Sequence, residues 1–226
     1  MNLLKLLIQL KMNKGILITL PRHDDVTEYL SAFSKEIEQE ASERGIKVKE
    51  LKDGEAVKNI FEKSLINLDY SMIVFNGHGT EDSIKGYKDE IIVASELNEN
   101  LLKERIVYAR SCHAASSLGK LATLGTKNGC FIGYIVPFKF WANSLYAHNP
   151  LKDDLARIFL EPSNLIPISL IKGNSAKEAS QNSKRRIIKN IKKILRNRTN
   201  ESAFIAGDLW NNYVGQVLLG NQSATL

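Results

Sequence analysis

The stretch Ile73-Val74-Phe75-Asn76-Gly77-His78-Gly79 is an apolar run that leads directly into a glycine-flanked histidine. A short continuous apolar run that ends in glycine predicts a buried strand, with the histidine just past its carboxyl end. A second stretch, Val107-Tyr108-Ala109-Arg110-Ser111-Cys112-His113, places a cysteine directly after another such run. Because functional groups in open α/β sheets gather at the carboxyl ends of parallel strands, we expect His78 and Cys112 to meet.

The sequence before this stretch alternates strand and helix patterns. Gly15–Leu20 and Ile46–Leu51 have the character of strands, and Val26–Arg44 and Glu55–Ile66 have helical spacing. Alternation of this kind is typical of parallel strands joined by helices that pack on the sheet. The sequence therefore predicts an α/β fold of three layers, αβα, around a mostly parallel sheet of about six strands.

The sequence after Gly79 extends the same pattern. We expect a small hairpin near Tyr87–Val93, strands over Arg105–Ala109, Cys130–Val136, Ile166–Ile171 and Gln216–Leu219, and helices over Ala94–Leu102, Ala114–Leu124, Asp153–Leu160, Asn174–Arg198 and part of the tail from Glu201. No repeat and no long linker divides the chain. Residues 15–226 are therefore expected to form one domain, and residues 1–14 are assigned to a leader or N-terminal extension.

Composition restricts the class of protein. The chain has 226 residues, of which 43% are hydrophobic and 25% charged, as in an ordinary globular domain. Its two cysteines, Cys112 and Cys130, are far apart in sequence, so no disulfide framework is indicated and a reducing, cytoplasmic location is expected. The apolar run Leu3–Leu10 is far shorter than the roughly 20 residues that span a bilayer, so no membrane span is expected.

The positive charge of the chain is local. The formal net charge is +6, but Lys184–Arg198 holds basic residues and no acidic ones, and the remaining sequence is slightly negative. Isoleucines such as Ile187 and Ile191 fall on one face of this predicted helix, with the basic residues largely on the other. We therefore expect the helix to pack on the sheet and expose its charges, which leaves a regulatory protein partner open and does not favour nucleic acid.

The two motifs resemble those of a known group of enzymes. Ile73–Gly79 is similar to the histidine motif of caspase-like cysteine peptidases, which include metacaspases, gingipains and CHAT-domain proteases, and Val107–His113 is similar to their cysteine motif. The tail Val217–Leu226 resembles the Leu-Gly-Asp-Pro ending of gingipain-like and CHAT members, with Asn221-Gln222 in place of Asp-Pro. The resemblance implies a caspase–haemoglobinase type sheet, a His/Cys dyad and no cofactor.

The chemistry of the residues fits a cysteine endopeptidase. A cysteine beside a histidine attacks a carbonyl carbon, and the histidine then protonates the departing amine. Cys112 is the expected nucleophile and His78 the general acid/base, and the backbone amides of Gly79 and Cys112 are the expected oxyanion hole. The expected substrate is a protein or peptide, cleaved through an acyl-enzyme.

Arg110 decides the expected substrate preference. Metacaspase-like relatives carry an Asp two residues before the nucleophile, where this chain has Arg110. If the guanidinium binds substrate, an acidic or small residue before the scissile bond is favoured. If Arg110 instead faces away and pairs with a surface acid such as Glu104 or Asp82, another carboxylate, such as Asp153 or Asp208, would retain a basic preference.

Two other interpretations remain open, and a third is disfavoured. The domain could be a catalytically silent caspase-like scaffold or receptor within a larger assembly, although such a domain has no chemical need for His78 and Cys112. It could be a doubly wound regulator whose glycine-bearing loops bind an anion. A metal site built from Cys112, His113, Cys130 and His148 is not expected, because their spacing matches no compact ligand pattern.

Overall fold

A central six-stranded sheet organises the computed structural model, which describes residues 15–67 and 70–226. The strand order is β2-β1-β3-β6-β7-β8. The strands are β1 (Ile16–Leu20), β2 (Val48–Lys52), β3 (Met72–Asn76), β6 (Ile106–Arg110), β7 (Cys130–Tyr134) and β8 (Gln216–Gly220). Only β8 runs antiparallel to its neighbour, β7. The leader or extension expected over residues 1–14 lies outside the described residues.

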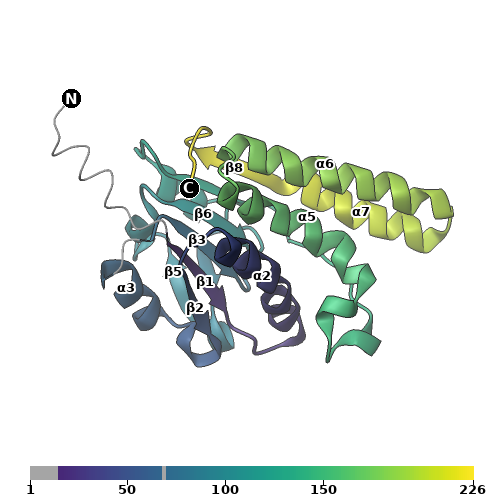
Figure 1. The fold of residues 1–226 in the computed structure, drawn as a ribbon, viewed down its shortest axis with the longest axis horizontal. Coiled ribbons are helices and arrows are strands. Elements are labelled where there is room, and N and C mark those ends of the chain that lie inside the picture. The colour runs from purple at the N-terminus through teal and green to yellow at the C-terminus, as the bar shows by residue number, and fades with distance from the viewer. Residues whose placement is uncertain (1–14, 68–69) are drawn as a thin grey trace.

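Helices cover both faces of the sheet, as Figure 1 shows. The α-helices are α2 (Asp25–Glu43), α3 (Lys58–Asn67), α4 (Leu118–Thr123), α5 (Asp154–Ile171), α6 (Ala176–Ile194) and α7 (Asn200–Gly215). One face packs against α2, α5 and α6, and the other against α3, α4 and a hairpin of β4 (Ser83–Lys85) and β5 (Ile91–Ala94). The three-layer α/β fold with a mostly parallel sheet is therefore confirmed.

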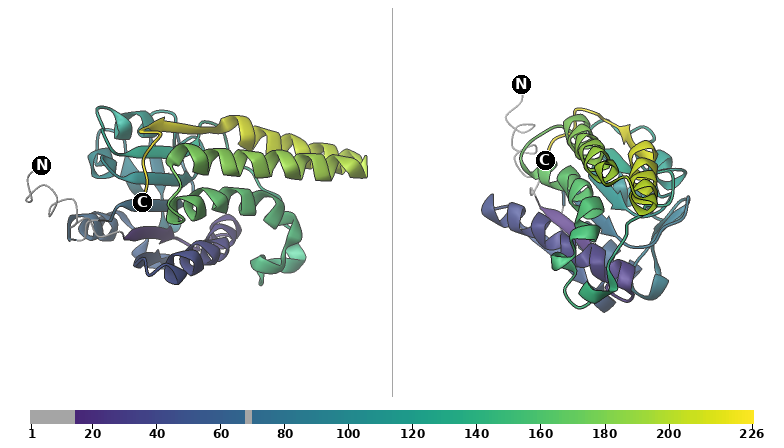
Figure 2. Two further views of the ribbon diagram at one scale, coloured as in Figure 1. Left: turned by 45° about the horizontal axis from the view of Figure 1, so that its top comes forward. Right: turned by 90° about the vertical axis from the view of Figure 1, so that its right-hand side faces the viewer.

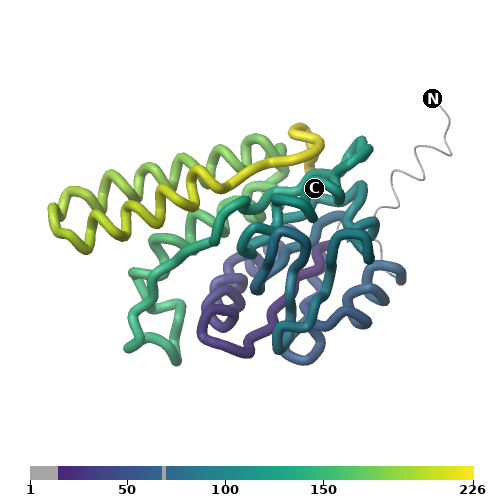
Figure 3. The backbone as a smooth tube through the Cα atoms, turned by 180° about the vertical axis from the view of Figure 1, so that it is seen from behind, coloured from purple at the N-terminus to yellow at the C-terminus, as the bar shows by residue number. Residues whose placement is uncertain are grey.

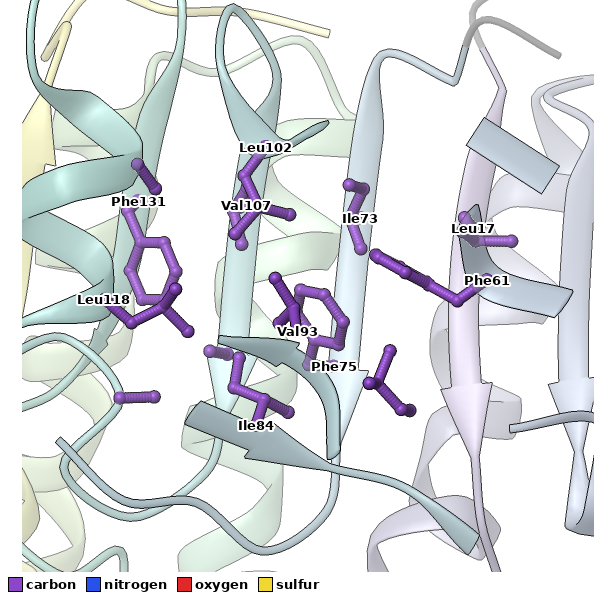
Figure 4. Close-up of a cluster of buried hydrophobic side chains, with 14 of the residues drawn as sticks. Leu17, Phe61, Ile73, Phe75, Ile84, Val93, Leu102, Val107, Leu118 and Phe131 are labelled. Carbon is purple, nitrogen blue, oxygen red and sulfur yellow. The ribbon is translucent and has the colours of Figure 1, made fainter. Parts of the chain in front are cut away.

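The central strands are buried on both faces, which explains their continuous apolar sequences. Ile73 and Phe75 of β3 point to the α3 side, where the Phe75 and Phe61 rings lie 5.3 Å apart and Figure 4 shows their neighbours. Met72 and Val74 point to the opposite side, against residues of α2 and α5. Alternate side chains of one strand thus fill two cores, as expected for parallel sheets covered by helices.

Helix α5 differs from the sequence prediction. A helix over Asp153–Leu160 and a strand over Ile166–Ile171 were expected, but one helix runs from Asp154 to Ile171 and contains Pro162 and Pro167. The strand prediction was wrong because a short apolar run has no period that separates a buried strand from a buried helix. Ile166 and Leu170 are fully buried against the sheet, so burial from a helix accounts for the same apolar residues.

Helices α6 and α7 lie side by side and project beyond the sheet. Figures 1 and 3, which view the molecule from opposite sides, both show this projection, and Figure 2 shows it from two further directions. Ile187 of α6 is buried, whereas Lys189, Lys192 and Lys193 are exposed, so the predicted basic outer face is confirmed. Within the described residues, no helix has both the length and the apolar composition needed to cross a bilayer.

Candidate active site

The motif residues His78 and Cys112 follow neighbouring strands at matched positions. Strands β3 and β6 pair in parallel, and Asn76 lies opposite Arg110 in their register. His78 and Cys112 therefore each stand two residues past a paired position, at the same edge of the sheet. This is the edge at which open α/β sheets carry their functional groups.

Gly79 brings the two loops into backbone contact. A Cβ atom at Gly79 would lie 2.7 Å from the carbonyl oxygen of Cys112 and 2.9 Å from Cβ of Ser111, so no side chain fits there. A Cβ atom at Gly77 would lie 2.3 Å from the carbonyl oxygen of Lys85, and Gly77 also has a φ of +156°. Glycine is thus required at both positions for the loop to pass between the hairpin and the Cys112 segment.

The amide of Gly79 is not used by the hairpin that holds it. Gly79 forms a single antiparallel bridge with Ile84. The hydrogen bonds of that bridge run from Lys85 N–H to the oxygen of His78 and from Thr80 N–H to the oxygen of Ser83, each 2.9 Å long. In this arrangement the central residue of the bridge keeps its own N–H free of the pairing. The Gly79 amide can therefore donate to another acceptor.

Asp24 holds the His78 ring, a contact that the sequence analysis missed. The Asp24 Oδ2 atom lies 2.7 Å from Nε2 of His78, and 36% of each side chain is exposed. Asp24 is also the N-cap of α2, where it accepts from the Thr27 amide. Burial opposes ionisation of this carboxyl, but the hydrogen bonds from Thr27 and His78 outweigh it and lower its pKa to about 2. An ionised Asp24 accepts a hydrogen bond from Nε2–H of His78, which leaves Nδ1 as the basic nitrogen of the ring.

Cys112 is partly buried. Burial raises the pKa of its thiol, and the thiol donates a hydrogen bond to the carbonyl oxygen of Phe138, with an S···O distance of 3.9 Å. The next residue, His113, has a left-handed φ of 58°. Its amide donates to the oxygen of Val136 and its Nδ1 atom lies 3.2 Å from the oxygen of Ile135. The segment after the thiol is therefore fixed against the end of β7.

Arg110 does not contact the candidate site, which corrects the expectation that it binds substrate. Its side chain is 0% exposed and points to the α2 and α5 side of the sheet. Within residues 15–67 and 70–226, the guanidinium donates to uncharged acceptors: Asn76 Oδ1, Ser163 Oγ, Asn164 Oδ1, Leu30 O and Ser34 Oγ. The alternative of a surface ion pair is equally wrong, because Glu104 instead binds the loop at Thr126–Asn128. Arg110 is a buried structural residue.

The two carboxylates proposed to supply a basic preference already have partners. Asp153 is fully buried, caps α5 and accepts from the hydroxyl of Tyr29. Asp208 accepts from Nζ of Lys139 and Nε1 of Trp141, each at 2.8 Å. Neither carboxylate is free to bind a cationic substrate side chain.

The remaining sequence candidates separate in space. Cys130 is buried in the core, and burial raises the pKa of its thiol to about 12, so it is inert. Among the described residues, the potential metal ligands that come together are His23, His78 and Asp89, and not the Cys112, His113, Cys130 and His148 set. His23 and Asp24 belong to the polar loop after β1. Their proximity to His78 follows from the β1–β3 pairing, which the sequence does not specify.

Comparison with known proteins identifies a similar fold. Neither a protein-family model nor a curated protein matches the sequence. Among solved structures, the chain is similar to the crystal structure of the Arg-specific cysteine proteinase gingipain R, with a TM-score of 0.59 and 12% sequence identity. The similarity covers 96% of this chain and 48% of that one, so the chain spans about half the length of gingipain R in that structure. The chain therefore shares the three-layer α/β fold of that structure.

Proposed function

We propose that this protein is a cysteine endopeptidase in which Cys112 is the nucleophile and His78 the general acid/base. One observation carries the proposal: a histidine and a cysteine follow neighbouring parallel strands at matched positions, and Gly79 joins their loops. The 2.7 Å contact between Asp24 and His78 adds a carboxylate that orients the imidazole. We assign Asp24 as a positioning residue for the pair.

The proposed reaction proceeds through an acyl-enzyme. Nδ1 of His78 takes the proton of the Cys112 thiol as the sulfur attacks the scissile carbonyl carbon. The imidazolium, stabilised by Asp24, then protonates the leaving amine as the C–N bond breaks. A water molecule, deprotonated by His78, hydrolyses the thioester and releases the second product with a free thiol. The raised pKa of the buried Cys112 thiol fits this scheme, because the base removes the proton during attack.

The oxyanion is stabilised by backbone amides in this proposal. The Gly79 N–H is free of the hairpin pairing, and the Cys112 N–H lies in the neighbouring loop. Each such donor typically contributes about 3 kcal/mol to the transition state. The proposed substrate is a protein or peptide. Arg110 does not enter its recognition, so the acidic preference is withdrawn.

The proposed activity requires a free thiol. Both Cys112 and Cys130 are free in the structure. We therefore place the enzyme in a reducing compartment such as the cytoplasm, where thiols persist.

A second candidate function is a catalytically silent scaffold. The hydrogen bond of the Cys112 thiol to the Phe138 carbonyl favours it, because this bond directs the proton away from an imidazole. Burial also disfavours the thiolate. In this case the domain binds a partner without turnover.

A thiol-reactive peptide probe separates the two functions. The wild-type chain, with reductant present, is expected to be labelled at Cys112 and to hydrolyse a fluorogenic peptide. Cys112→Ala and His78→Ala should each abolish turnover with an unchanged urea unfolding curve, because the two residues act as a unit. Cys130→Ala is the matched control and should retain both properties. Turnover by Cys112→Ala at the wild-type rate would show that the assignment is wrong, and labelling that is independent of His78 without turnover would favour the scaffold.

A further inference from the structure

His23 lies beside the candidate site with both ring nitrogens unsatisfied. Only 12% of its side chain is exposed, and neither Nδ1 nor Nε2 has a hydrogen-bond partner. The nearest carboxylate oxygen, Oδ2 of Asp24, lies 3.6 Å from Nε2, which is beyond hydrogen-bond distance. A buried polar atom without a partner is costly and is commonly explained by a bound water or ion.

The groups around His23 are those that bind metals. The His23 ring lies 6.1 Å from the ring of His78 and 6.0 Å from that of Tyr87, edge-on in both cases. One ligand atom from each of His23, His78 and Asp89 lies within 4.8 Å of the others. Asp89 is exposed on the turn between β4 and β5, with a φ of 61°. Three separate segments thus bring two imidazoles and a carboxylate together.

We propose that His23, His78 and Asp89 form a binding site for a divalent transition-metal ion, with Zn²⁺ as the expected ion. Two imidazoles and one carboxylate suit zinc, whereas Ca²⁺ and Mg²⁺ prefer ligand sets made of oxygen. Metal-binding histidines usually donate their other ring N–H to a carboxylate, and His78 already does so to Asp24. The fourth position of a tetrahedral ion remains open to water.

Small movements complete the geometry. Zinc–ligand bonds of about 2.1 Å place tetrahedral ligand atoms about 3.4 Å apart. The ligand atoms, which lie within 4.8 Å of one another here, must draw closer to reach that spacing, and the exposed Asp89 side chain has the most room to move. His23 and His78 are fixed from the ends of β1 and β3, which pair directly.

The ion competes with catalysis. Nε2 of His78 is bound to Asp24, so a metal takes Nδ1, the nitrogen that accepts the Cys112 proton in the proposed reaction. Zinc at this site therefore inhibits the peptidase reversibly. The inhibitory role rests on the proposed function, whereas metal binding itself does not.

Zinc binding is measured first in a chain that cannot turn over. Calorimetric titration of the Cys112→Ala chain with ZnCl₂ is expected to give one site, and Co²⁺ should give the visible absorption bands of a tetrahedral nitrogen–oxygen site. His23→Asn and Asp89→Asn should each weaken zinc binding by about tenfold or more. Asn also accepts the left-handed backbone of residue 89, so this variant should fold normally. His148→Asn, at an exposed histidine elsewhere, is the matched control and should bind as the parent does.

Two results would overturn the metal site. The first is a parent chain that binds no zinc, and the second is unchanged affinity in both His23→Asn and Asp89→Asn. Inhibition is tested separately, with Cys112 present: zinc should block probe labelling and EDTA should restore it, and Asp89→Asn should require about tenfold more zinc. Zinc that binds the three residues without slowing labelling would overturn the inhibitory role alone. A chain without peptidase activity would still bind zinc. Failure of the proposed function can therefore be told apart from failure of the metal site.

Discussion

Replacement of Arg110 by methionine tests whether this residue supports the fold or the substrate site. Methionine fills a similar volume but donates no hydrogen bonds. The guanidinium is fully buried, and burial lowers its pKa. Among the described residues, no carboxylate lies within ion-pair distance of it. The cost of the substitution therefore depends on the uncharged acceptors that lose their donor.

The expected loss of unfolding free energy is about 3 kcal/mol. The two serine hydroxyls can rotate to other acceptors, and the oxygen of Leu30 also accepts from Oγ of Ser34. The side-chain oxygens of Asn76 and Asn164 lose all the hydrogen bonds that Arg110 gives them. Two unsatisfied buried acceptors cost about 2–6 kcal/mol in total, and removal of a buried charge offsets part of this cost.

Urea unfolding followed by circular dichroism measures this loss. Arg185→Met, the same substitution at an exposed position on α6, should change stability by less than about 0.5 kcal/mol. If Arg110→Met does not fold, Arg110→Lys retains the charge without the planar fork and should still be less stable than the wild type. A loss below about 1 kcal/mol together with an altered preference for substrate would refute the buried network.

Three further outcomes test the site and its surroundings. Asp24→Asn preserves a good helix N-cap but removes the charge beside His78. In a fluorogenic assay kcat should therefore fall about 10- to 100-fold, with little change in Tm. An unchanged kcat would show that Asp24 is not part of the site. Because burial raises the pKa of the Cys112 thiol, alkylation by iodoacetamide should still accelerate above about pH 8.5, and a plateau near pH 6 would instead reveal a thiolate–imidazolium pair. We expect nearly unchanged stability to urea and an unchanged peptidase rate when glutamine replaces four exposed basic residues together, Lys189, Lys192, Lys193 and Arg196. A large loss of unfolding free energy would show that these side chains pair internally.

The sequence predicted the parts of the fold in which local pattern and burial agree. The apolar runs of β3 and β6 are buried on both faces, so their lengths and the placement of His78 and Cys112 after them could be derived directly. Helix α6 has one apolar and one basic face, so the sequence alone predicted which face is buried and which is exposed.

The rest depended on contacts that a single sequence does not specify. The local sequence around Asp24 is that of a helix N-cap, and Asp24 is the N-cap of α2. Its hydrogen bond with His78 depends on the pairing of β1 with β3, which the local sequence does not reveal. Arg110 follows a buried strand as a substrate-binding residue would, but strand alternation turns it to the face opposite Ala109. Acceptors of α2 and α5, distant in sequence, join Asn76 of β3 in making that burial tolerable.

The antiparallel strand β8 has a consequence for the order in which the chain assembles. Ile132 of β7 pairs with Leu218 of β8, and helices α5, α6 and α7 all intervene in the chain. The four strands β1, β3, β6 and β7 pair over shorter separations, so β8 makes the longest-range strand pairing of the sheet. Until then β7 presents an open apolar edge, which is a template for pairing with other chains. The yield of folded protein is therefore expected to depend on how quickly α6 and α7 pack together and allow β8 to pair with β7.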